Sequence, residues 1–142
     1  MSNKHIGFLI KQVHYLQEQR LNNKFKEFGL TASQTFTLIY LLKSHDKGIT
    51  VNQKDIEKEL DISNPTVTGI LNRLEVKGLI ARVPCRHDAR AKNIEVTSKA
   101  LELNKQLQAM FRQLDEKLVA SLSKEEVDNL HEYLIRILRS DS

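Results

Sequence analysis

Basic and small polar side chains are concentrated in one stretch of the chain. Residues 62–93 hold six Lys or Arg and two acids, a net charge of +4, whereas residues 1–61 carry +2 and residues 94–142 carry −2. Basic side chains neutralise phosphates, and short hydroxyl or amide groups can hydrogen-bond to base edges. A solvated surface of an ordinary α+β domain would have the same modest charge, so charge alone leaves both interpretations open.

The first half of this stretch predicts a helix with one polar face. Ser63-Asn64-Pro65 is a helix start, in which Ser and Asn are expected to cap free N–H groups and Pro suits the first turn. Gly78 is expected to end the helix. Apolar residues at helical spacing mark its inner face: Val67, Ile70, Leu71 and Leu74. Short, uncharged or basic residues mark the other face: Thr66, Thr68, Gly69, Asn72 and Arg73.

The second half predicts a basic hairpin. Residues 79–83 and 92–97 are expected to be strands, and residues 84–91 the loop between them. In the second strand Ile94 and Val96 alternate with polar residues, as in a half-buried strand. A polar helix followed by a basic hairpin suits a surface that places the helix in a DNA groove and the hairpin on phosphates.

Helices before this stretch must position it. Thr31-Ala32-Ser33-Gln34 has capping-box spacing and predicts a helix to about Ser44. Thr50-Val51-Asn52-Gln53 repeats that spacing and predicts a short helix to Leu60, with Val51, Ile56 and Leu60 on its inner face. A short helix, a brief turn at 61–62 and a second helix form a helix-turn-helix, and the added hairpin makes it winged.

Long amphipathic helices are predicted at both ends of the chain. One covers residues 5–27, one runs from the Thr97-Ser98 cap to about Ala120, and a capping box at Ser123 starts the last, which extends to about Arg139. The last helix is expected to have an inner face of Val127, Leu130, Leu134, Ile137 and Leu138. A small winged helix does not need these apolar stripes for itself, and a two-fold dimer would bury them. Its two recognition helices would contact half-sites one turn apart, ~34 Å along the duplex.

Length and composition narrow the class of protein. A chain of 142 residues predicts a single domain. One cysteine, Cys85, rules out an intrachain disulfide framework and fits a reducing compartment. The sequence has no apolar run near the ~20 residues of a membrane span and no signal-peptide core at its start, so a cytoplasmic location and no membrane partner are expected.

Catalytic signatures are missing from the sequence. It contains no glycine-rich phosphate loop and no G-x-S-x-G motif, so no enzyme activity is predicted. No metal and no cofactor are predicted, because the five histidines are scattered and lack ligand spacing. They are His5, His14, His45, His87 and His131.

Three segments in this order and spacing resemble the MarR family of bacterial winged-helix transcription regulators. They are Leu30-Thr31-Ala32-Ser33-Gln34, then Leu71-Asn72-Arg73-Leu74-Glu75-Val76-Lys77-Gly78-Leu79-Ile80, and Asp88-Ala89-Arg90-Ala91-Lys92-Asn93-Ile94-Glu95-Val96-Thr97. The last follows the family's wing pattern D-x-R-x-K-x-I-x-V/L-T. The resemblance covers nearly the whole chain.

The resemblance implies a mainly α (α+β) fold with four helices, a two-stranded wing and two further helices. Within a single domain of residues 1–142, residues 31–97 would be the winged helix-turn-helix, and residues 1–30 and 98–142 the dimerisation helices. It also implies a homodimer that binds double-stranded DNA at a pseudo-palindromic operator. The regulator would most often be a repressor, and a small-molecule effector that the sequence does not identify would release it.

The resemblance also assigns DNA-contacting residues. The recognition helix, 63–77, would enter the major groove and the wing, 84–92, the minor groove. Arg90 would be the arginine inserted in the minor groove, and Asp88 would hold neighbouring arginines by ion pairing, or the pair would merely tighten the loop. The full candidate set is Ser63, Asn64, Pro65, Thr66, Thr68, Asn72, Arg73, Arg86, Asp88, Arg90 and Lys92.

Two further alternatives stay open at the level of sequence. Cys85 lies next to Arg82, Arg86 and His87, so it is either an oxidation-sensitive thiolate or a small residue at a strand end. The winged helix is either a DNA-binding element or a protein–protein interaction module without DNA recognition. Salt-sensitive DNA binding would distinguish the last two.

Overall fold

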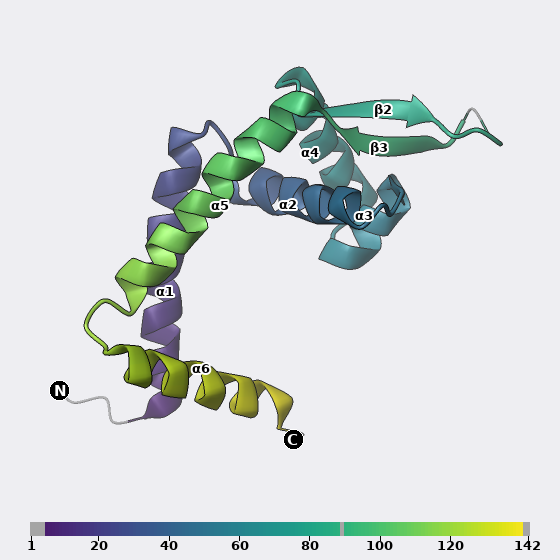
Figure 1. Ribbon diagram of the computed structural model, residues 1–142. Helices are drawn as coiled ribbons and strands as arrows, with labels where there is room; N and C mark the ends of the chain where they lie inside the picture. Colours follow the sequence, from purple (N-terminus) through teal and green to yellow (C-terminus); the bar gives the residue numbers. More distant parts are fainter. Residues whose placement is uncertain (1–4, 89, 141–142) are drawn as a thin grey trace.

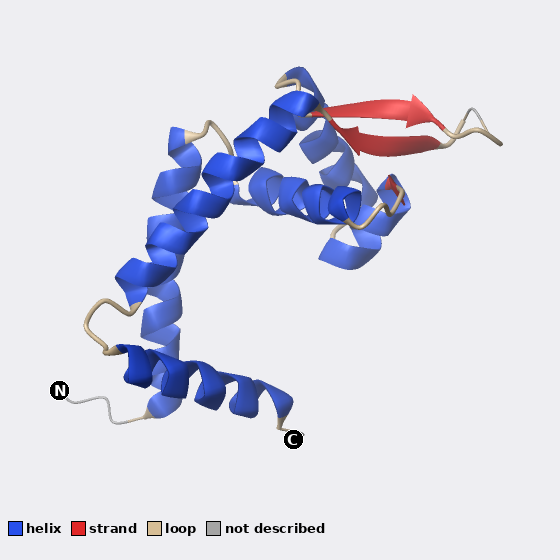
Figure 2. Ribbon diagram, in the orientation of Figure 1, coloured by secondary structure: helices blue, strands red, loops and turns tan. Residues whose placement is uncertain are grey.

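The chain is mainly helical, with a small sheet (Figures 1 and 2). The computed structural model describes residues 5–88 and 90–140. Its elements are α1 (Ile6–Glu27), α2 (Ala32–Asp46), β1 (Val51–Asn52), α3 (Gln53–Leu60), α4 (Asn64–Val76), β2 (Ile80–Pro84), β3 (Lys92–Val96), α5 (Ser98–Leu118) and α6 (Lys124–Arg139). This order confirms the predicted winged helix-turn-helix, to which the structure adds a third short strand.

The elements form a C-shaped molecule (Figure 1). Helices α1 and α5 pack against each other and both contact α2, which packs on α4. Helix α6 lies at one end of the C, and the β2–β3 hairpin extends from the other. The core joins the winged part to α1 and α5, and among its fully buried side chains are Phe25, Leu38, Ile56, Leu71, Leu74 and Leu107.

The sheet is antiparallel with strand order β1-β3-β2. Val51 pairs with Ile94 in β1–β3, and the β2–β3 register runs from Ile80 opposite Val96 to Pro84 opposite Lys92. Strand β1 corrects the predicted start of the third helix. Val51 is buried in the sheet and not on a helix, as suits a β-branched residue.

The capping box of α3 therefore lies two residues later than predicted. The Asn52 side chain accepts a hydrogen bond from the Asp55 N–H at 2.9 Å, and the Asp55 carboxylate accepts one from the Asn52 N–H at 2.9 Å. Asn52 is an equally good N-cap and leaves Thr50 outside the helix. The capping boxes predicted at Thr31 and Ser123 are confirmed.

The start of α4 also differs from the prediction. Ser63 occupies the N-cap position, but its side chain makes no capping bond. Its hydroxyl lies 2.9 Å from the Thr66 hydroxyl, and the Asn64 amide donates to the Glu57 carboxylate at 2.8 Å. Capping by Ser and Asn was thus wrong, because both side chains have other partners. The end is as predicted, with Gly78 in the left-handed conformation at φ +76.

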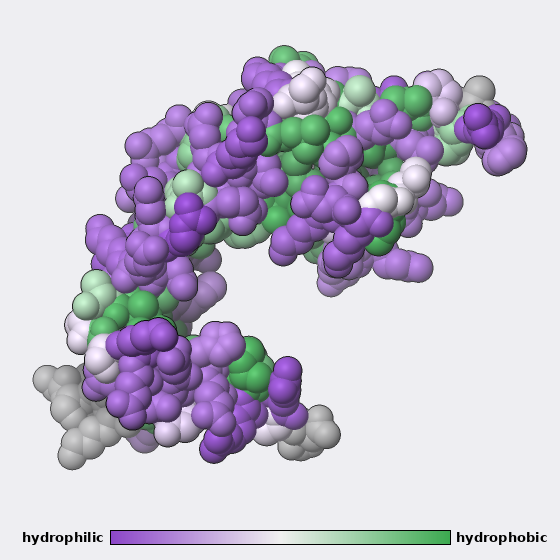
Figure 3. All heavy atoms as spheres, in the orientation of Figure 1, coloured by the Kyte–Doolittle hydropathy of each residue, from purple (hydrophilic) through white to green (hydrophobic). Residues whose placement is uncertain are grey.

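The terminal helices expose much of their apolar surface, part of which is visible on α6 in Figure 3. Ile6 at the start of α1 is 65% exposed and Val13 is 48% exposed. Helix α6 buries no residue, and Leu138 is 79% exposed. The inner face predicted for the last helix is therefore only partly covered within one chain. Val127 is half-buried, and the other four residues are exposed: Leu130, Leu134, Ile137 and Leu138. None of the helices in the described ranges is long and apolar enough to cross a bilayer.

Candidate nucleic-acid interface

Helix α4 presents one polar face. Its apolar residues Val67, Ile70, Leu71 and Leu74 are buried, as their spacing predicted. On the opposite side six of the seven candidate residues are exposed, and Thr68 is half-buried. The exposed ones are Ser63, Asn64, Pro65, Thr66, Asn72 and Arg73. The structure thus brings the helical part of the candidate set onto one surface.

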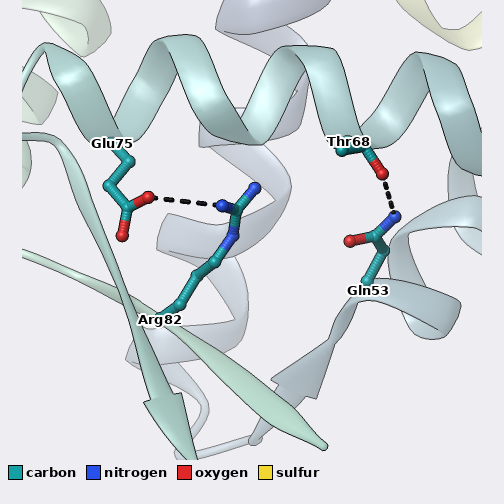
Figure 4. A network of polar contacts seen from close by, with 4 residues as sticks. All are labelled: Gln53, Thr68, Glu75 and Arg82. Atoms are coloured by element: carbon teal, nitrogen blue, oxygen red, sulfur yellow. Dashed lines mark hydrogen bonds and ion pairs between the residues drawn. The ribbon is translucent and has the colours of Figure 1, made fainter.

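Thr68 is held from the neighbouring helix. Gln53, the first residue of α3, donates from Nε2 to the Thr68 hydroxyl at 2.8 Å (Figure 4). The same nitrogen donates to the Asn64 carbonyl at 3.3 Å. Because the Thr68 oxygen accepts from Gln53, the Thr68 O–H group is still able to donate a hydrogen bond, and the bond to Gln53 holds its oxygen in place. The two helices of the helix-turn-helix are joined by polar bonds beside the exposed face.

A carboxylate fixes Asn64 in a similar way. Glu57 in α3 accepts from Asn64 Nδ2 at 2.8 Å. This bond uses an amide donor of Asn64, so its Oδ1 is left to face solvent as an acceptor. Glu57 also adds a negative charge close to the start of α4, which disfavours a phosphate at that point.

A hollow lies beside the C-terminal half of α4. It has a volume of about 650 Å³ and is lined by residues of α4 and its C-cap, of the α1–α2 turn and of the first turn of α2. They are Gly29, Thr31, Gln34, Gly69, Asn72, Arg73, Val76 and Lys77. Arg73 Nη1 donates to the Gly69 carbonyl at 3.3 Å, so its guanidinium lies back along the helix. The Arg73 side chain therefore borders open space on the outer side of α4.

Two lysines join the end of α4 to the long helices. Lys77 Nζ donates to the Gly29 carbonyl at 2.6 Å, just after α1. Lys99 Nζ, in the first turn of α5, donates to the Lys77 carbonyl at 2.6 Å. Both bonds are between a charged donor and a carbonyl at a helix end, which is a favourable arrangement.

The hairpin extends beyond the helical surface. Arg86, Asp88, Arg90 and Lys92 are all exposed, and residue 89 of the predicted wing lies outside the described residues. Asp88 Oδ1 accepts from the Arg90 backbone N–H at 3.0 Å and from Arg90 Nε at 3.3 Å. The expected ion pair is thus present, although the Arg90 side chain is 94% exposed. The geometry leaves the guanidinium accessible beyond the strands.

A second ion pair joins the hairpin to α4. Arg82 Nη1 in β2 lies 3.3 Å from Glu75 Oε1 (Figure 4). Arg82 is 24% exposed, so this pair is less screened by solvent than the pair at the hairpin tip. It orients β2 against the helix. Because Arg82 is paired with Glu75, it is less available to bind a phosphate than the exposed basic residues of the hairpin.

The remaining candidate, Cys85, lies at the end of the hairpin strand. Its thiol Sγ lies 3.1 Å from Asn93 Oδ1, and its backbone N–H donates to the Ala91 carbonyl at 2.9 Å. Cys85 is half-buried. Its contacts suit a residue that closes the hairpin end.

Gln53, Glu57 and Glu75 lie beside the candidate residues, and the sequence analysis did not single them out. Each contacts a candidate residue or the hairpin through a hydrogen bond or ion pair. The i to i+15 spacing of Gln53 and Thr68 has no local periodicity that could have indicated the contact. Only the helix-turn-helix pattern, which places α3 against α4, indicated that residues of these two helices would be in contact.

Other titratable groups add little chemistry to this surface. Burial raises the pKa of Tyr40 above its ordinary range, and the nearby carboxylates Asp55 and Glu59 raise it further, so the phenol stays neutral. Within residues 5–88 and 90–140, no three His, Cys, Asp or Glu side chains gather as metal ligands.

The chain is similar in sequence and in structure to known regulators of one family. The sequence profile of the MarR family matches residues 28–91. A mutant of S. aureus MepR is 30% identical over 94% of this chain and 96% of its own, with a TM-score of 0.85. The S. aureus MepR–DNA complex is 32% identical over 96% and 98%, with a TM-score of 0.73. The reduced form of E. coli MarR covers 99% and 100% with a TM-score of 0.80, and at 24% identity it shows the fold alone.

Proposed function

The chain belongs to the MarR family of transcription regulators, and we propose that it is a dimeric, sequence-specific DNA-binding regulator. Helix α4 would lie in the major groove and residues 84–92 in the minor groove. The observation that carries this proposal is the exposed polar face of α4 next to an accessible, basic hairpin. A similar chain, S. aureus MepR, has been crystallised with DNA, which supports the same partner here.

The proposed contacts divide by chemistry. On α4, hydroxyl, amide and guanidinium groups suit base edges in the major groove. On the hairpin, Arg90 suits the negative potential of a narrow minor groove, while Arg86 and Lys92 suit phosphates. Asp88 would hold the Arg90 backbone and side chain in position, as its two bonds suggest. Residues 31–97 are thus the proposed DNA-binding part.

The terminal helices are the proposed dimer interface. Residues 1–30 and 98–142 would bury the apolar side chains that α1 and α6 leave exposed in one chain, such as Ile6, Leu134 and Ile137. Contiguous exposed apolar surface of this kind is typical of an interface. A two-fold dimer would place two α4 helices on an inverted-repeat operator.

Repression released by a signal is the proposed output. Occupation of an operator by the dimer would exclude polymerase, and a small molecule that favours a DNA-incompatible spacing of the two α4 helices would lift it. A ligand achieves this only through different affinities for the two dimer conformations. DNA binding is therefore the step to test first.

The decisive experiment is selection of duplexes from a random pool by the purified protein, followed by sequencing. We expect an inverted repeat with half-sites about one turn apart, ~34 Å. Binding to the selected duplex should weaken as salt rises, because phosphate contacts release counterions. A folded dimer that enriches no sequence and shows no salt-dependent binding would contradict the proposal and favour a protein-interaction module.

A further inference from the structure

A glycine occupies the middle of the α4 face. Gly69 lies one turn after Thr66 and one turn before Arg73, so the three share one side of the helix. Glycine destabilises a helix interior relative to alanine, and Gly69 is not among the glycines with positive φ. The backbone conformation therefore does not require it.

Core packing does not require this glycine either. An added Cβ at Gly69 would meet, apart from the helix's own backbone, a single atom within 4 Å, and that atom is Arg73 Nη1 at 3.3 Å. The missing side chain therefore makes room for one group, the Arg73 guanidinium. That guanidinium donates to the Gly69 carbonyl at 3.3 Å and lies over the glycine.

Arg73 is available for a new partner. Within the described ranges it makes no ion pair with a carboxylate, whereas Arg82 and Arg90 each do. Its one hydrogen bond uses one of five N–H donors. The side chain is exposed and borders the hollow of about 650 Å³, so it can move without disturbing the core.

We propose that Gly69 determines sequence specificity by letting the Arg73 guanidinium occupy the centre of the α4 face, where it recognises a guanine. Arginine binds guanine O6 and N7 in the major groove with two parallel hydrogen bonds. A side chain at position 69 would hold the guanidinium away from that place. This inference rests on the proposed function, since it presumes that α4 lies in the major groove.

The position favours a base over a phosphate. Gly69 lies between Thr66 and Asn72 on the outward side, and not at its margin. The neighbouring lysine, Lys77, is already bonded to the Gly29 carbonyl at the margin. An arginine at the centre of a groove-facing helix points at base edges, whereas basic groups at the margins meet the backbone.

The test compares variants on selected and random duplexes. Gly69→Ala adds a single methyl group next to the Arg73 guanidinium, and Gly69→Leu adds a side chain large enough to fill the space over the glycine. Both residues are better helix formers than Gly, so the melting temperature should hold or rise. Arg73→Ala removes the guanidinium, and Arg73→Lys keeps the charge but loses the two-bond geometry. Val76→Leu adds bulk to an 88% exposed residue that lines the same hollow, and so controls for bulk that is not placed over the glycine.

We expect Gly69→Leu, Arg73→Ala and Arg73→Lys to lose the preference for guanine at the same base pair of each half-site. Specific binding should fall roughly 5- to 150-fold, the range for one bidentate contact, while binding to random DNA changes little. Gly69→Leu combined with Arg73→Ala should be no worse than either alone. Val76→Leu should keep the wild-type preference.

Two outcomes would overturn the inference in different ways. If Arg73→Ala leaves every base preference intact and lowers the salt slope by about one, Arg73 contacts a phosphate and Gly69 has no part in specificity. If Gly69→Leu keeps the guanine preference that Arg73→Ala loses, the glycine is not needed. Wild-type protein that binds no DNA would instead refute the proposed function itself.

Discussion

Gln53 and Thr68 are joined by a 2.8 Å hydrogen bond from the Gln53 amide to the Thr68 hydroxyl, which links the first residue of α3 to the second turn of α4 (Figure 4). The bond is partly buried, and the same amide also reaches the Asn64 carbonyl. It fixes the angle between the two helices next to the surface proposed to contact DNA.

Gln53→Ala should therefore lower the free energy of unfolding by about 0.5–1.5 kcal/mol, the net value of a protein hydrogen bond. Thr68→Val, which keeps the side-chain shape, should do the same. In the double variant the two losses should not add in full, because both single variants remove the same Gln53–Thr68 bond, and Gln53→Ala removes in addition only the bond to the Asn64 carbonyl. Urea unfolding of the four proteins measures this, and fully additive losses would show that the bond contributes nothing.

Arg90→Ala should weaken operator binding and leave the dimer and the fold intact. The side chain is 94% exposed and pairs only with Asp88, so its effect on unfolding should stay within about 0.5 kcal/mol. Fluorescence anisotropy on the selected duplex gives the affinity, and light scattering the oligomeric state. Lys43→Ala, a substitution of an exposed lysine in α2 outside both the candidate set and the proposed dimer interface, is the charge-matched control. Wild-type affinity in Arg90→Ala would remove the hairpin from the mechanism.

Asn72→Ala should change the preferred sequence more than the salt dependence of binding. An exposed amide on α4 can pair with adenine N6 and N7, and its loss removes a base contact but no phosphate contact. Duplex selection with this variant should give a relaxed position in each half-site, with the slope of log affinity against log salt unchanged. An identical selected site would show that Asn72 is only a surface residue.

Removal of residues 123–142 should yield a monomer. Helix α6 has no fully buried residue in its own chain and exposes Leu130, Leu134 and Ile137, so its loss should cost the fold of the winged part little. Sedimentation should show a single-chain mass, and tight binding to an inverted repeat should be lost because two linked half-sites raise affinity. The unchanged α4 and hairpin should keep weak binding to a single half-site. A truncated protein that stays dimeric would contradict the proposed role of α6.

The winged fold could be predicted because its signals are local. The apolar spacing of Val67, Ile70, Leu71 and Leu74, the glycine at the end of α4 and the alternation around Ile94 are each contained within one element. The strand at Val51–Asn52 was missed because two residues carry no periodicity, and it exists only through pairing with β3.

The interface could be predicted as a surface but not as a set of contacts. Which α4 residues point outward follows from helix geometry alone. The partners Gln53, Glu57 and Arg82 depend on how α3 and β2 pack on α4, and such packing is decided by the whole core. For the same reason the Asn64 side chain is bonded to Glu57 of α3 and caps no helix N–H group. The Ser63 hydroxyl instead has a local partner, the Thr66 hydroxyl in the first turn of α4.

The two lysine bonds at the end of α4 have a mechanical consequence. Lys77 connects α4 to the end of α1, and Lys99 connects it to the start of α5, so the C-terminal end of α4 moves with these two ends of the long helices. The N-terminal end of α4, which is bonded to α3 and not to the long helices, is about 20 Å away, at ~1.5 Å per residue. A small rotation of α1 against α5 therefore becomes a larger sweep of residues 63–66, which makes the angle between two distant helices the quantity that sets the register of the protein on its target.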